Sequence, residues 1–133
     1  MNAERKKWIA WIVLCIIVII IGLAILLKPK VDYESMNNEI MEYINGLENI
    51  KEINSDKAGI YKLTLEDSTW YAAEEKDKAG YCLAVNTTIT AICQKYKALE
   101  EVQRAQIFYY DESGVLIAEP SDKSYTLESK ILY

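Results

Sequence analysis

The longest hydrophobic pattern in the chain is an uncharged run from Trp8 to Leu27, WIAWIVLCIIVIIIGLAILL. At about 1.5 Å of rise per helical residue, this run is long enough to span the roughly 30 Å hydrocarbon core of a bilayer. It is longer than the apolar part of a secretory signal peptide and ends without a small-residue cleavage site. The pattern therefore predicts a single transmembrane helix, with Trp8, Trp11, Leu27 and Lys28 as membrane-anchor residues.

Positive charge is concentrated ahead of this run. Three basic residues occupy positions 5–7, whereas only two follow the run closely, at positions 28 and 30. Cytoplasmic flanks of membrane helices carry an excess of Lys and Arg. We expect residues 1–7 to be cytoplasmic, residues 8–27 to cross the cell membrane once, and the remaining C-terminal domain to be extracytoplasmic.

A second periodicity appears in the juxtamembrane segment 28–57. We expect Pro29 to end or kink the first helix, because proline removes a backbone donor. Apolar residues then recur at spacings of three and four, at Tyr33, Met36, Ile40, Tyr43, Leu47 and Ile50. This spacing predicts an amphipathic helix, followed by a loop at 54–59. The helix either packs on its own domain or pairs with a partner, and in the second case Met36, Tyr43 and Ile50 are contact residues.

The remaining residues, 58–133, show strand and helix patterns in alternation. Residues 60–72 alternate between apolar and polar positions and predict a hairpin that closes near Trp70. Residues 74–100 predict a helix with one apolar stripe. Residues 106–110 and 115–118 flank a turn at Asp111–Gly114 and predict a second hairpin. The tail, 124–133, predicts either a last strand or a disordered end.

The order of elements after the anchor is thus helix, hairpin, helix, hairpin. Two αββ units of this kind can form a four-stranded antiparallel sheet with both helices on one face. We therefore predict the α+β class, with a single transmembrane helix followed by an αββαββ, ferredoxin-like two-layer sandwich.

Charge and composition exclude several kinds of chemistry. Residues 1–27 hold three of the 15 Lys and Arg and one of the 20 Asp and Glu, so the chain from Lys28 onward carries a net charge of −7. An acidic domain repels phosphate backbones, which argues against nucleic acid as a partner. Histidine is absent, so Ser-His and Cys-His nucleophile pairs cannot form within the chain. We expect no enzymatic activity, catalytic residue, metal or cofactor.

The cysteines and carboxylates give no signal for a catalytic or metal site. Cys82 and Cys93 lie on one predicted helix, roughly 16 Å apart, too far for a disulfide. Two small core residues are the favoured interpretation. Carboxylates at 66–67 and 111–112 fall at predicted turns, where charged residues serve solvation and capping.

Two aromatic positions are the candidate contact residues of the domain. Tyr109 and Tyr110 are neighbours in a predicted strand, so they point to opposite faces and one of them, Tyr110, is expected to meet a partner. Trp70 is expected either to cap the core or to contact a ligand.

The arrangement resembles the bitopic alignment proteins of type IV pilus and type II secretion machines. The resemblance covers the order of elements, the membrane exit at residues 27–30 and the heptad-like stretch from Tyr33. It implies a short cytoplasmic N-terminus, one membrane helix and an extracytoplasmic αββαββ domain.

Two classes of function follow from these patterns. The first is a non-enzymatic single-pass scaffold or assembly component of a cell-envelope complex, whose partners are the lipid bilayer and either another protein or a second copy of itself. The second is a membrane-tethered ligand-binding module or inhibitor with Trp70 in its site. Exposure of the Met36, Tyr43 and Ile50 stripe would favour the first class, and an apolar pocket beside Trp70 the second.

Overall fold

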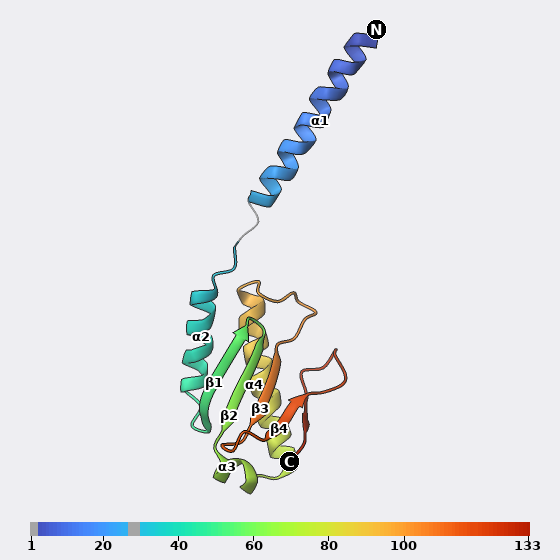
Figure 1. Ribbon diagram of the computed structural model, residues 1–133. Helices are drawn as coiled ribbons and strands as arrows, with labels where there is room; N and C mark the ends of the chain where they lie inside the picture. The colour runs from blue at the N-terminus through green and yellow to red at the C-terminus, as the bar shows by residue number, and fades with distance from the viewer. Residues whose placement is uncertain (1–2, 27–29) are drawn as a thin grey trace. The chain divides into compact units, whose positions relative to one another are not determined.

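A computed structural model describes residues 3–26 and 30–133 (Figure 1). The chain divides into two compact units, Met1–Lys30 and Val31–Tyr133. The first contains helix α1 (Ala3–Leu26), whose apolar side chains, Trp8 and Trp11 among them, are exposed within this structure. Over Ala3–Ala24, this helix is long and apolar enough to cross a membrane. The predicted boundary residues Leu27 and Lys28 lie outside the described residues.

The second unit begins with helix α2 (Tyr33–Asn45). Asp32 caps it, because its carboxylate accepts a hydrogen bond from the Ser35 amide at 3.1 Å. The predicted amphipathic stripe is present, and its residues Met36, Ile40 and Ile44 are buried. However, the helix stops at Asn45, several residues earlier than predicted.

Strand β1 (Ile50–Lys57) follows where the sequence indicated the end of a helix and a loop. A register shift between Ile50 and Glu52 inserts an extra residue into the pairing with the next strand, so Ile50 and Ile53 face the core at a spacing of three. That spacing imitates a helical pattern. The assignment of Ile50 to the helix and of 54–57 to a loop was therefore wrong.

The first hairpin pairs β1 with β2 (Ile60–Leu65) in antiparallel register. Gly59 makes the turn with a φ of +88°, a conformation that glycine adopts without steric cost. Only the first half of the predicted hairpin at 60–72 is a strand. The second half is a short helix, α3 (Asp67–Ala72), which contains Trp70.

Helix α4 (Glu75–Lys95) confirms the predicted long helix. Cys82 and Cys93 are both fully buried on its inner stripe, as the sequence predicted. Burial raises the pKa of the Cys82 thiol to about 12, so this thiol stays protonated at neutral pH.

The sheet has the order β1-β2-β3-β4-β5, completed by β3 (Gln106–Tyr110), β4 (Leu116–Pro120) and β5 (Ser129–Ile131). The predicted second hairpin is present as β3 and β4, and the C-terminal tail supplies the last strand. The prediction of a four-stranded antiparallel, ferredoxin-like sheet was wrong, because β2 and β3 are parallel and a fifth strand is present. The long connection through α3 and α4 returns the chain to the end of the sheet where β2 began, as parallel pairing requires. The fold is mixed α+β.

The helices α2 and α4 cover one face of the sheet, and Figure 1 shows α4 behind the strands. Tyr61, Leu63 and Leu65 of β2 and Ile107 and Tyr109 of β3 are buried on this face. The Tyr109 hydroxyl donates to Asn86 Oδ1 of α4 at 2.7 Å, which places α4 directly over the sheet centre. Within the Val31–Tyr133 unit, α2 and α4 leave the opposite face of the sheet uncovered.

Candidate interaction site

The open face of the sheet can be assigned from the strand register, because paired residues point to the same side. Lys62 pairs with Phe108, Thr64 pairs with Tyr110, and Tyr110 pairs with Leu116. Each of these residues alternates with a buried neighbour, so all of them lie on the face opposite α4. The same register places nine residues there: Glu52, Asn54, Lys62, Thr64, Phe108, Tyr110, Leu116, Glu119 and Lys130.

An apolar patch occupies the middle of this face. Phe108, Tyr110 and Leu116, which we call the open-face patch, are each half-buried by their neighbours. Phe108 and Tyr110 come from the central strand β3, and Leu116 comes from β4. Two aromatic rings that are partly accessible beside one leucine form a surface of the kind enriched at protein interfaces.

Charges of both signs flank the open-face patch. Lys62 lies beside Phe108 on β2, and Glu119 follows the inward-facing Ala118 on β4. Because Tyr109 pairs with Ala118 in antiparallel register, the next pair along places Glu119 beside Phe108. Lys62, Phe108 and Glu119 therefore form one row across three neighbouring strands, with a cation at one side of the ring and an anion at the other. Lys130 of β5 continues this row beside Glu119.

The turn between β3 and β4 is held by its own carboxylate. Asp111 is buried, and its Oδ1 accepts hydrogen bonds from the amides of Ser113 and Val115, each at 2.9 Å. Its Oδ2 accepts from the Tyr71 hydroxyl of α3 at 2.8 Å. These bonds, that from Val115 above all, hold the pKa of Asp111 below its usual value.

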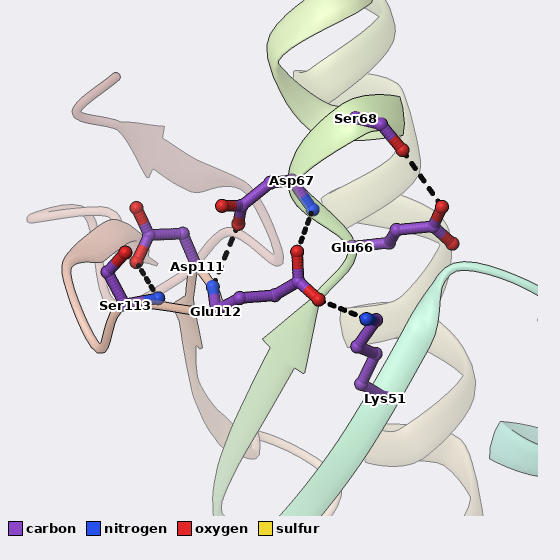
Figure 2. A network of polar contacts seen from close by, with 7 residues as sticks. All are labelled: Lys51, Glu66, Asp67, Ser68, Asp111, Glu112 and Ser113. Atoms are coloured by element: carbon purple, nitrogen blue, oxygen red, sulfur yellow. Dashed lines mark hydrogen bonds and ion pairs between the residues drawn. The ribbon is translucent and has the colours of Figure 1, made fainter.

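Figure 2 shows a second set of polar contacts that ties this turn to the start of α3 and to β1. The Glu112 amide donates to Asp67 Oδ1 at 2.8 Å, and the Asp67 amide donates back to Glu112 Oε2 at 3.3 Å. Lys51 forms an ion pair with Glu112 and lowers the pKa of that carboxyl. The carboxylates of Asp67 and Glu112 therefore already accept hydrogen bonds from backbone amides, and Glu112 also pairs with a lysine. Residues 3–26 and 30–133 contain no group of three or more His, Cys, Asp or Glu that could hold a metal.

Trp70 is packed rather than open to a ligand. Its ring is 5% exposed, and its Nε1 donates to the carbonyl oxygen of Tyr133 at 3.1 Å. Lys78 Nζ lies 5.4 Å from the ring centroid, in cation–π geometry. The hollow beside the ring measures about 190 Å³, smaller than the roughly 300 Å³ at which small-molecule pockets begin.

A larger open groove, of about 600 Å³, separates α2 from the β1–β2 turn. Tyr33, Asn37 and Met41 line one wall, and Ser55 and Lys57 line the other. The groove is wide and mixed in polarity, with no converging set of charged groups to select a ligand.

The structure places the four predicted contact residues differently. Met36 is completely buried, so it cannot meet a partner in this fold. Tyr43 and Ile50 are half-buried at the edge of the core. Tyr110 alone lies on the open face.

Sequence reasoning missed Phe108, Leu116, Lys62 and Glu119. The alternation in Gln106–Tyr110 pointed to Phe108 as a companion of Tyr110, since residues two apart share a face. Leu116 was hidden by the irregular register between β3 and β4, and only the sheet order brings Lys62 and Glu119 to either side of Phe108.

Fold and site together define a class: an α+β domain with an N-terminal apolar helix, a five-stranded mixed sheet and one open sheet face. No family model, curated protein or solved structure matches the chain. These comparisons therefore give no support to the resemblance to pilus and secretion alignment proteins, and the four-stranded antiparallel sheet that it implies is not the sheet observed.

Proposed function

We propose that this protein is a single-pass membrane protein that acts as a non-enzymatic scaffold or assembly component of a cell-envelope complex. The observation that carries the proposal is the open-face patch, Phe108, Tyr110 and Leu116, on the sheet face opposite α2 and α4. Aromatic residues on a central strand offer a large contact area, and ordering their side chains costs little entropy.

The membrane part of the proposal is supported by α1. This helix is long and apolar enough to cross a bilayer, and three basic residues precede the uncharged run of the sequence. The N-terminus is then cytoplasmic and the Val31–Tyr133 unit extracytoplasmic.

A contact function fits the chemistry of the chain better than catalysis. The sequence contains no histidine, and the carboxylates around Glu112 are engaged with backbone amides and Lys51. The alternative of a ligand module at Trp70 is disfavoured, because the indole N–H is already bonded and the hollow beside it is small.

The proposal is tested by in-cell crosslinking from a single photoreactive residue. At Tyr110 we expect one defined crosslinked species in the membrane fraction, because this side chain lies on the open face. The matched controls are Tyr125, which is exposed in a loop outside the sheet, and Met36, which is buried. Neither control should give the species seen at Tyr110.

The proposal fails if Tyr110 captures no protein while the chain is folded and present in the membrane. It also fails if Tyr125 captures the same species as efficiently, since the contact would then not involve the open face.

A further inference from the structure

We infer that the open face binds the open face of a second copy of this chain, with a twofold axis running along β3. The inference rests on the proposed function, because it names the protein partner of the same surface. It is carried by the arrangement of charge on the two sides of β3.

The row through Phe108 carries charges that are complementary to those of a second copy. A twofold axis along β3, midway between two stacked sheets, brings β2 of one copy over β4 of the other. Lys62 then faces Glu119 of the second copy, since both lie in the row of Phe108. The same operation brings Glu119 over the other copy's Lys62, so the symmetry makes two ion pairs.

The middle of the face brings apolar side chains of the two copies together. Residues on the axis meet their own counterparts, so Phe108 faces Phe108 and Tyr110 faces Tyr110. Thr64 and Leu116, which flank Tyr110 on β2 and β4, face each other. The dimer therefore buries an apolar centre between two ion pairs, the usual composition of an interface.

The edge of the sheet offers a poorer contact. The edge strand β1 has two register shifts, between Ile50 and Glu52 and between Asn54 and Lys57, and its exposed residues are polar. Irregular, charged edges resist the addition of a further strand. The β1 edge is therefore a poorer contact surface than the open face. Opposite charges on the two sides of the Phe108 ring are complementary to a second copy related by a twofold axis.

The charge row gives a sharp test with full-length protein reconstituted in phosphatidylcholine nanodiscs or mild detergent. Lys62→Glu alone places two carboxylates opposite each other in both contacts, and Glu119→Lys alone places two ammonium groups there. We expect each variant to weaken self-association at least about tenfold, measured by energy transfer between two labelled populations. A one-to-one mixture of the two variants restores every opposite-charge pair, so it should associate within about threefold of the wild type.

Charge reversal at Lys123→Glu is the matched control, because Lys123 is exposed in the loop between β4 and β5 and lies outside the open face. It should change self-association less than about threefold. Circular dichroism of each variant establishes that the fold is retained.

Crosslinking at the axis provides an independent measurement. Stacked sheets lie about 10 Å apart, beyond the roughly 7 Å limit between Cα atoms for a disulfide, so a short bismaleimide is the appropriate reagent. In a Cys15→Ser background, Phe108→Cys should give a covalent dimer, and Tyr125→Cys should not. Cys82 and Cys93 are fully buried and do not compete.

The outcomes separate the two proposals. If the mixture of charge variants associates no better than either alone, or Phe108→Cys gives no dimer, the self-contact is overturned. Should Tyr110 still capture a different membrane protein in cells, the scaffold function stands with that protein as its partner. If Tyr110 captures nothing and the chain is monomeric, both proposals are overturned.

Discussion

A buried hydrogen bond joins the central strand to the helix above it. The Tyr109 hydroxyl donates to Asn86 Oδ1 at 2.7 Å, and Asn86 Nδ2 donates to the Leu127 carbonyl oxygen at 2.8 Å and to Ser129 Oγ at 2.7 Å. One asparagine on α4 thus connects β3, the loop before β5 and β5 itself. Polar groups buried in this way stabilise a fold only while every partner is present.

Tyr109→Phe is expected to lower the free energy of unfolding by about 1–2 kcal/mol, because Asn86 Oδ1 loses its donor inside the core. Urea unfolding measures the difference. Tyr110→Phe is the matched control, since that ring lies on the open face, and it should stay within about 0.5 kcal/mol of the wild type. Equal effects of the two substitutions would contradict the assigned faces.

Asp111 makes stability depend on acid. Its folded-state pKa lies below the unfolded value, so its ionised form stabilises the fold above roughly pH 4. This contribution disappears as the pH falls through the folded-state pKa. Asp111→Asn should therefore be less stable than the wild type at pH 7, with a smaller difference at pH 3.

Urea unfolding at these two pH values measures the effect, with the exposed Asp122→Asn as control. A difference between Asp111→Asn and the wild type that is the same at both pH values would argue against a stabilising carboxylate in the turn.

At the scale of elements, the β1–β2 hairpin depends on one glycine. Gly59 has a φ of +88°, and a Cβ there would lie 3.2 Å from Leu99 Cδ2. Gly59→Ala is expected to cost about 1–2 kcal/mol, from left-handed backbone strain and from the displaced leucine.

The control is Gly80→Ala in α4, where a Cβ would meet no atom within 4 Å. This change should raise the free energy of unfolding by about 0.5–1 kcal/mol, because alanine favours a helix over glycine. Thermal unfolding of both variants compares them. Destabilisation by Gly80→Ala and none by Gly59→Ala would contradict the assigned turn.

At the scale of the whole molecule, the Val31–Tyr133 unit has a buried hydrophobic core of its own. The buried hydrophobic residues of this core run from Met36 to Ala118. The fragment 31–133 is therefore expected to remain in aqueous solution and to unfold in one cooperative transition in urea. Full-length protein should instead partition into vesicles. A fragment without cooperative unfolding would show that α1 is needed for folding.

Several elements were predictable from local pattern. The apolar run of α1, the stripe of α4 and the β3–β4 hairpin are long or strongly periodic, and each was predicted near its observed position. β1 was not, because its bulge spaces Ile50 and Ile53 as a helix would. α3 was missed because six residues are too few to show a helical period.

Sequence alone determined which residues are apolar, that histidine is absent and that Tyr109 and Tyr110 oppose each other, since these depend on composition and on the two-residue period of a strand. Tertiary structure decided that Met36 is buried, that β2 and β3 are parallel, and that Lys62 and Glu119 flank Phe108. Those relations join residues far apart in the chain. They follow from how the long connection through α4 returns to the sheet, which no local pattern specifies.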